Sequence, residues 1–255
     1  MRILFVVLFG WGLAFLTAST PILESGVYTW SNLKAKKVQG IKKKQVLTGS
    51  TTDLEKLNIS TVTLSPGQII KPDALTDREE LIIVKEGTLN VSTQTASKTL
   101  GVGGIALAIA GEKRELKNTS GQPVTYYILA FKSKAPVNTT RGQVAGSFLQ
   151  DWSEMVIKKT DKGESRANFD RPTPVFTKFD MHATALNPGF ASHAPHTHRS
   201  EEIMLLLQGE VEAQIGEEFR KATAGDVIFI RPDVPHALKN IGKQPCGYFA
   251  IKWQN

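Results

Sequence analysis

Short apolar runs separated by turns recur along most of this chain. The runs 81–84 and 203–207 have the length of buried strands, and Gly87 and Gly209 follow them where hairpin turns would fall. Similar runs occupy 105–109, 124–131, 227–230 and 248–253. Many short strands with frequent turns predict an all-β sandwich or barrel.

The pattern occurs twice, because one shift of 122 positions aligns two halves of the chain. The shift pairs Glu80 with Glu202 and Gly87 with Gly209, and further pairs extend from Trp30 with Trp152 to Tyr126 with Tyr248. So many pairs at one shift predict two copies of a structural unit. We expect these units at 28–132 and 151–255, joined by the polar, turn-rich linker 133–150.

The first residues have the character of a targeting segment. Met1 and Arg2 form a short positive start, 3–16 is apolar, and small residues suited to cleavage follow. These features predict a secretory signal peptide over 1–20, and hence an exported protein, periplasmic or secreted. The apolar run is shorter than the roughly 18 residues of a spanning helix, so we expect no stable membrane anchor. A retained anchor segment is the alternative.

Composition and charge narrow the class of protein. The hydrophobic content of 41% is enough for a real core, and the single cysteine, Cys246, has the neighbours of a buried strand residue. The formal net charge of +7 is uneven, because six lysines fall between Lys34 and Lys44. We interpret this run as a solvated arm. It lacks interleaved aromatics and any known motif, so we do not expect nucleic-acid binding.

The stretch 189–209 carries the strongest chemical signal. His196 and His198 stand two residues apart, so on a strand both imidazoles would point to one face. Glu202 can join them if the next strand folds back beside the first. The stretch 225–240 adds His236. Three imidazoles and one carboxylate suit a first-row transition ion.

These two stretches resemble the paired motifs of the cupin superfamily. The first has Gly, then H-x-H, then Glu and a later Gly, and the second has Gly-Asp, an apolar strand, a proline turn, His and Asn. Val234 departs from the pattern, at a turn position often held by Gly. The resemblance implies a double-stranded β-helix, or jelly roll, in each half. The expected fold is therefore all-β, with two tandem cupin barrels.

The same resemblance implies a ligand set for the second barrel, namely His196, His198, Glu202 and His236. The expected cofactor is a divalent transition metal: Mn, Fe, Ni or Zn. A barrel that kept these residues without binding a metal is the alternative. In the first half the shift places Ala74, Thr76 and Arg114 opposite the three histidines, and only Glu80 remains. Ala cannot coordinate an ion and Arg repels one, so we expect a structural barrel there.

Two further histidines are candidates for catalysis. His182, in an expected strand over 179–186, and His193, beside the H-x-H stretch, could act as general acid or base near neutral pH. Each could equally be a surface or hydrogen-bonded histidine. Arg199 and Arg231 could bind a substrate carboxylate, or form ordinary surface pairs. If Glu202 faces inward, alternation predicts that Met204, Leu206 and Gln208 do so too.

The predicted function is that of an exported, metal-dependent bicupin enzyme acting on a small polar metabolite at the second barrel, as a hydrolase or isomerase. The layout also resembles the (S)-ureidoglycine aminohydrolase family, although that family carries E-x-H-x-x-x-H with a Gln, where this chain has H-x-H-x-x-x-E and a His. An Fe-dependent dioxygenase and a non-catalytic, metal-dependent binding module are the alternatives. Exposed jelly-roll edges favour a homodimer, unless the basic run covers one.

Overall fold

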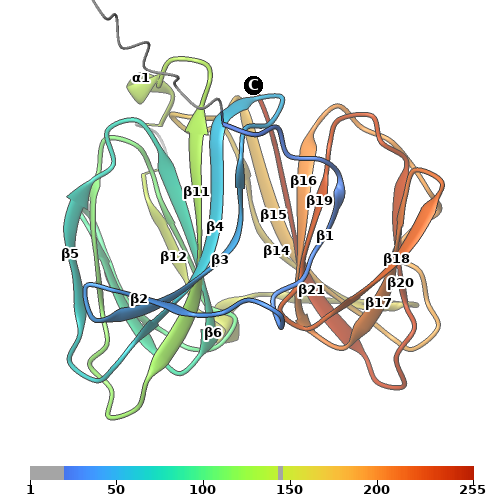
Figure 1. The fold of residues 1–255 in the computed structure, drawn as a ribbon, viewed down its shortest axis with the longest axis horizontal. Coiled ribbons are helices and arrows are strands. Elements are labelled where there is room, and N and C mark those ends of the chain that lie inside the picture. The colour runs from blue at the N-terminus through green and yellow to red at the C-terminus, as the bar shows by residue number, and fades with distance from the viewer. Residues whose placement is uncertain (1–19, 143–145) are drawn as a thin grey trace, which may run out of the picture.

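The computed structural model describes residues 20–142 and 146–255, which form two β-barrels side by side (Figure 1). Residues 1–19 of the expected signal peptide lie outside the described residues. In the described part of the chain, no helix has the length and apolar character needed to cross a membrane. The predicted all-β fold is confirmed. Besides strands and turns, these ranges contain only the short helix α1 (Thr139–Gly142) and a 3-10 turn at Trp152–Glu154.

The N-terminal barrel consists of a large and a small antiparallel sheet. The large sheet has the order β12-β9-β6-β11-β4-β3-β2, and the small sheet β5-β10-β7-β8. The large-sheet strands are β2 (Lys36–Val38), β3 (Ile41–Gly49), β4 (Leu54–Leu64), β6 (Glu79–Glu86), β9 (Ile105–Ala108), β11 (Val124–Ser133) and β12 (Phe148–Gln150). The small-sheet strands are β5 (Ile69–Ala74), β7 (Leu89–Thr93), β8 (Ser97–Leu100) and β10 (Lys113–Lys117).

The C-terminal barrel repeats this plan. Its large sheet has the order β1-β19-β16-β21-β15-β14-β13 and its small sheet β18-β17-β20. The large-sheet strands are β1 (Gly26–Tyr28), β13 (Ile157–Thr160), β14 (Gly163–Arg171), β15 (Lys178–Leu186), β16 (Glu201–Gln208), β19 (Val227–Ile230) and β21 (Cys246–Gln254). The small-sheet strands are β17 (Glu210–Ile215), β18 (Glu218–Thr223) and β20 (His236–Asn240). The bounds of β6 and β9, shifted by 122, coincide with those of β16 and β19.

The edge strand of each large sheet comes from a segment that lies next to the other barrel in the sequence. β1 precedes the N-terminal barrel but pairs with β19 of the C-terminal barrel, with Gly26 opposite Phe229. β12 lies at the end of the expected linker but pairs with β9 of the N-terminal barrel, with Phe148 opposite Leu107. The blue segment in Figure 1 follows the first of these crossings. The barrels are therefore joined by backbone hydrogen bonds as well as by side chains.

The two large sheets pack face to face over a shared apolar core, which we call the inter-barrel core. Its aromatic centre takes Phe131 from β11, Phe179 from β15 and Trp253 from β21, all fully buried. The ring of Phe131 meets those of Phe179 and Trp253 edge-on, at centroid distances of 5.4 and 5.5 Å. Such edge-to-face pairs stabilise beyond their area burial. Each barrel also has a smaller core between its own two sheets.

Both β6 and β16 begin with two glutamates that face opposite ways, because neighbours on a strand alternate. Glu79 and Glu201 lie on the side of the inter-barrel core, and Glu80 and Glu202 point into their own barrels. Both strands are buried on both faces. This explains why their sequences are continuous apolar runs rather than alternating ones.

Glu201 connects the barrels through a full set of donors. It accepts hydrogen bonds from the Thr51 hydroxyl (2.7 Å) and the Thr52 amide (2.8 Å) of the N-terminal barrel. It also accepts one from the indole Nε1 of Trp253 (2.9 Å). Glu79 makes the reciprocal contact, accepting from the Val175 amide (3.0 Å). However, Phe131 stands where the other half has Trp253, and Glu79 Oε2 has no hydrogen-bond partner among the described residues.

This missing donor has an electrostatic consequence for Glu79. Burial raises the pKa of its carboxyl to about 7, and the hydrogen bonds from Val175 and Thr173 and the charge of Arg171 offset this only in part. An unfolded glutamate has a pKa near 4.3. Between these values the folded chain holds a proton that the unfolded chain has lost. The contribution of Glu79 to the free energy of unfolding therefore falls as pH rises from about 4.5 to about 7.

We expect Glu79→Gln to remove this pH dependence, because the amide does not ionise. The free energy of unfolding of the wild type, minus that of the variant, should fall by about 2 to 3 kcal/mol between pH 4.5 and pH 8. Urea titrations of both chains across this range measure the difference, and the shared titrations of other groups cancel. A difference that stays constant with pH would contradict the assignment.

The sequence had suggested that the basic run is a solvated arm; its lysines in β2 are exposed, but the run lies in two paired strands and not in an arm. Lys36 and Lys37 lie in β2, and 41–44 begins β3. The two strands form a hairpin through Gln39 and Gly40, whose φ angles of +49° and +82° are those of a tight type I′ turn. Lys44 Nζ then lies 3.7 Å from the ring centroid of Trp30. Sheet pairing with β4 therefore orders this charged run.

Candidate metal centre

Four candidate ligands lie close together inside the C-terminal barrel, and different parts of the backbone position them. Glu202 is held by the large sheet, at the start of β16, and His236 is the first residue of β20 in the small sheet. His196 joins His236 through two backbone hydrogen bonds of 3.0 and 3.2 Å. His198 follows two residues later, where its carbonyl accepts from the Asp233 amide (2.9 Å). The site therefore lies where the two sheets come together.

The H-x-H stretch is not a strand. The prediction that His196 and His198 share one face had assumed that it was. By the shift it corresponds to β5, but here 191–196 makes only isolated bridges, at Ala191 and His196. Pro195 has no amide hydrogen and cannot continue a ladder. The imidazoles converge nevertheless. The ring centroid of His236 lies 4.6 Å from that of His196 and 4.9 Å from that of His198.

The nitrogen and oxygen atoms are close enough for one ion. One ring nitrogen from each of His196, His198 and His236 lies within 4.8 Å of the others. The Oε2 atom of Glu202 is 3.0 Å from Nε2 of both His198 and His236. The three imidazole nitrogens are thus close enough to share one small cation, and Glu202 lies beside two of them.

The hydrogen bonds of the imidazoles show that these donors fit a metal. Nδ1 of His198 lies 2.8 Å from the Ser200 carbonyl, and Nδ1 of His236 lies 2.9 Å from the Val234 carbonyl. A carbonyl oxygen only accepts, so each Nδ1 carries the hydrogen and each neutral ring presents a lone pair at Nε2. Two lone pairs then face the carboxylate of Glu202, which is unfavourable unless protons or a cation lie between them. Backbone carbonyls that orient metal-binding imidazoles in this way are a common outer shell.

The electrostatics of the cluster shift Glu202 and His196 toward the charge states that bind a metal, and shift His198 toward its protonated form. Burial alone would raise the pKa of Glu202, but hydrogen bonds with His198 and His236 outweigh it and lower the pKa to about 2. Burial lowers the pKa of His196, and the neighbouring histidines lower it further. The hydrogen bond with Glu202 raises the pKa of His198. The carboxylate of Glu202 is thus ionised across the physiological range, and it is hydrogen bonded to two imidazoles.

The proline turn before His236 explains the departure at Val234. The left-handed residue of this turn is Asp233, with φ of +60°, a conformation that aspartate tolerates better than most residues. Val234 needs no glycine there, and its carbonyl is the one that orients His236.

A cavity of about 330 Å³ opens beside the cluster, and both candidate catalytic histidines line it. The Nδ1 atom of His182 lies 3.4 Å from the Asp180 carboxylate, which leaves Nε2 available. The ring centroid of His193 lies 4.1 Å from that of His196, and its Nδ1 contacts the Ala194 carbonyl at 3.0 Å. The structure therefore brings both residues to the cavity, and whether either one is catalytic stays a prediction.

The cationic residues at this cavity are not the ones expected from the sequence. Arg199 pairs with Asp53 of the N-terminal barrel (2.8 Å), and Arg231 pairs with Glu24 (2.7 Å). Lys162 and Lys252 line the cavity instead. Lys252 lies directly opposite Glu202 in the β16–β21 register. Only strand pairing reveals this neighbour, because the two residues are 50 positions apart.

The predicted inward alternation along β16 holds for two of its three residues. Met204 lines the cavity and Leu206 is buried in the core of the C-terminal barrel. Gln208 does not follow, because the register of β16 on β21 shifts between Leu206 and Gln208. Its amide lies 3.4 Å from the Pro245 carbonyl outside the cavity. Such a bulge changes the face on which the following residue lies.

Comparisons with known proteins agree with this architecture. Residues 183–252 match the family model of the cupin domain. A curated relative, the (S)-ureidoglycine aminohydrolase of Arabidopsis thaliana, is 24% identical over 188 residues, which cover 69% of this chain and 57% of the relative. The chain thus spans little more than half the length of that protein.

Solved structures resemble the whole described fold. A putative glyoxylate induced protein from Pseudomonas aeruginosa matches with a TM-score of 0.73 at 18% identity, over 96% of this chain and 94% of that one. Oxalate decarboxylase from Lactobacillus farciminis, in a formate complex, matches with a TM-score of 0.70 at 13% identity, over 91% and 87%. These likenesses show that the chain has the bicupin fold, and the family match places a cupin domain at residues 183–252.

We expect His196→Ala and His236→Ala each to abolish stoichiometric binding of a divalent transition metal, because alanine offers no donor. Arg114→Gln, at the position equivalent to His236 in the other barrel, is the matched control and should keep full metal content. Elemental analysis of the purified proteins measures the stoichiometry. Excess metal should also raise the melting temperature of the wild type but not of the histidine variants. If the Arg114 variant lost its metal as fully as His196→Ala, the site would not be confined to the C-terminal barrel.

Proposed function

We propose that the C-terminal barrel holds a divalent transition metal on His196, His198, His236 and Glu202 and is the active site of a hydrolase or isomerase for a small polar metabolite. The observation that carries this proposal is the approach of Nε2 of His198 and of His236 to within 3.0 Å of Glu202 Oε2, with both Nδ1 atoms already hydrogen bonded to carbonyls. When bound, the ion would polarise a carbonyl group or lower the pKa of a water molecule.

The walls of the cavity carry two cations and two carboxylates, Glu164 and Glu202, and so suit a small polar substrate. Lys162 and Lys252 bring two ammonium groups, and Ser165, Thr184 and Tyr248 bring hydroxyls. A cavity of about 330 Å³ suits a small metabolite. The names of two similar proteins also refer to small polar compounds, since one is an aminohydrolase of a ureido compound and the other a decarboxylase of oxalate. We therefore infer a small carboxylate-bearing substrate.

His182 is the best-placed residue for moving a proton. Burial alone would raise the pKa of Asp180, but its hydrogen bond with His182 and the charge of Lys252 outweigh this and lower it. An ionised Asp180 orients the imidazole through Nδ1 and leaves Nε2 to exchange a proton with a substrate in the cavity. His193 lies on the exposed side, nearer the metal ligands, and is the second candidate for proton transfer.

The experiment couples metal analysis to turnover. Metal-loaded protein is assayed on ureido compounds, sugar acids and small carboxylates, with oxygen uptake followed to detect dioxygenase chemistry. On the substrate that turns over, we expect His182→Gln to lower kcat by about 100-fold or more at unchanged metal content. Lys178→Gln, an exposed change on the same strand, is the control and should leave kcat unchanged.

Asp180→Asn separates positioning from proton transfer. It should shift the pH profile of kcat and lower kcat less than His182→Gln does, because the imidazole remains. A natively folded protein that binds no divalent metal would contradict the proposal. A His182→Gln variant with full kcat would contradict the proposed role of His182 in proton transfer. Ligand capture without turnover by any of these substrates would favour the non-catalytic binding module.

A further inference from the structure

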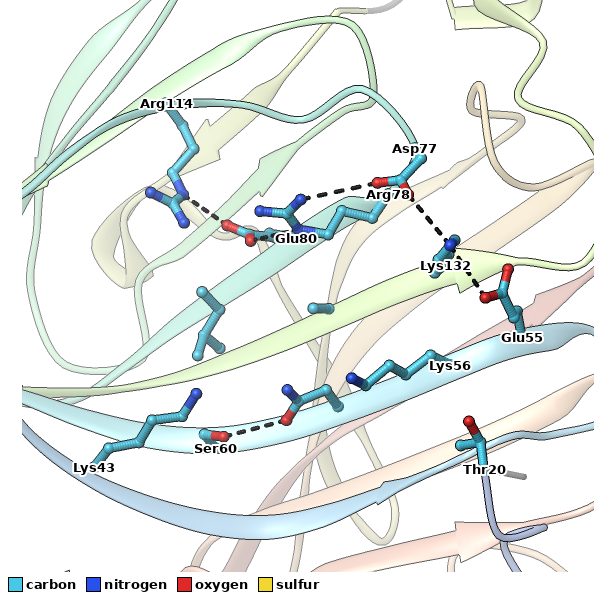
Figure 2. Close-up of a pocket in the computed structure, with 13 residues that line it drawn as sticks. Thr20, Lys43, Glu55, Lys56, Ser60, Asp77, Arg78, Glu80, Arg114 and Lys132 are labelled. Carbon is cyan, nitrogen blue, oxygen red and sulfur yellow. Dashed lines mark hydrogen bonds and ion pairs between the residues drawn. The ribbon is translucent and has the colours of Figure 1, made fainter. Parts of the chain in front are cut away.

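The N-terminal barrel contains a larger cavity, of about 620 Å³, in the place equivalent to the metal centre (Figure 2). Its lining includes five cationic residues: Lys43, Lys56, Arg78, Arg114 and Lys132. Three carboxylates line it as well. The walls of this cavity therefore carry an excess of two positive charges, which no wall residue neutralises.

Arg114 takes the position that His236 holds in the other barrel. Its Nε donates to Glu80 Oε2 at 2.6 Å, and Nε of Arg78 donates to Glu80 Oε1 at 3.1 Å. Both oxygens of the carboxylate equivalent to Glu202 are therefore engaged by guanidinium groups. With no imidazole left beside Glu80, this cavity is built to receive an anion rather than a cation.

Part of the Arg114 guanidinium is buried without an acceptor. The residue is only 5% exposed, and its Nη1 has no hydrogen-bond partner in the described ranges of the chain. A buried donor left unpaired is destabilising, and more so for a charged group. An oxyanion in the cavity would supply the acceptor, through a charge-assisted hydrogen bond.

Two further cations face the cavity from the large sheet. Lys43 lies on β3 and Lys56 on β4, and within the described residues neither forms an ion pair with a carboxylate. Lys132, by contrast, lies between Glu55 (3.1 Å) and Asp77 (3.4 Å). Figure 2 shows Arg114 and Glu80 on one side of the cavity, and Lys43 and Lys56 on the other. The available donors are therefore divided between two opposite walls.

We propose that the N-terminal barrel is a metal-independent binding site for a small dicarboxylate. One carboxylate accepts from Nη1 of Arg114, and the other lies between Lys43 and Lys56. A dianion matches the excess of two positive charges. Its two separated acidic groups also suit donors on opposite walls better than the single centre of a phosphate ion does. This site is independent of the metal centre proposed for the other barrel.

Calorimetric titration of malonate and succinate into the full chain tests the proposal. We expect binding in the wild type and in His236→Ala, since the metal centre is not involved. Lys43→Gln and Lys56→Gln should each weaken the affinity by about tenfold or more, as expected for a lost charge-assisted hydrogen bond. Arg114→Gln should weaken it further. Lys36→Gln removes the same charge from an exposed position of the same barrel and is the matched control, with unchanged affinity.

Uncharged malonamide should not bind, because it offers no charge to the three cations. Absence of malonate binding in the His236→Ala variant would overturn the proposal, as would equal affinities in Lys43→Gln and the wild type. Inorganic phosphate that binds as tightly as malonate would overturn the dicarboxylate class. If Arg114→Gln fails to fold because Glu80 loses a partner, the two lysine variants still decide the outcome.

Discussion

The structure depends on the apolar core shared by the two barrels. The large sheets bury one face against each other, around Phe131, Phe179 and Trp253. Each barrel is completed by this contact, because an apolar sheet face must be buried against another layer. The exchange of β1 and β12 extends the same association through backbone hydrogen bonds. Since most aromatic residues are used between the barrels, the interior of each barrel is left free to accommodate polar groups.

Adjacent glutamates at the start of β6 and β16 connect this association to the sites. Alternation along a strand places Glu79 and Glu201 against the opposite barrel, and Glu80 and Glu202 in the interior of their own. Glu201 meets the turn at Thr51, and Glu79 meets the equivalent turn before Val175. Because each pair shares one strand, the inter-barrel contact also sets the position of the carboxylate at each site. The pairing of Glu202 with His236 is thus supported from both sides of β16.

The two barrels differ in how they neutralise the inner glutamate. In the C-terminal barrel two imidazole Nε2 atoms lie 3.0 Å from the carboxylate, in a set of donors that suits a divalent transition ion. In the N-terminal barrel two guanidinium groups occupy that role, and positive charge remains in the cavity. A few inner residues at equivalent positions therefore give the two barrels interiors of different charge. The fold is common to both, and the side chains at equivalent positions decide the chemistry.

The repeat and the apolar runs predicted two copies of an all-β sandwich or barrel, because buried strands and frequent turns leave a periodic trace in the sequence. The resemblance to the cupin superfamily made these two tandem barrels. The same resemblance implied that His196, His198, Glu202 and His236 form one set, although His196 and His198 do not lie on a strand as their spacing had suggested. Tertiary structure alone decided which groups join them. Lys252 reaches Glu202 through strand register, His182 acquires Asp180 as a partner, and Arg199 is drawn away by Asp53. The basic run was misread for the same reason, since pairing with β4 orders β3 and brings Lys43 to a cavity. Such contacts join residues that are distant in sequence, and they exist only once the sheets have formed.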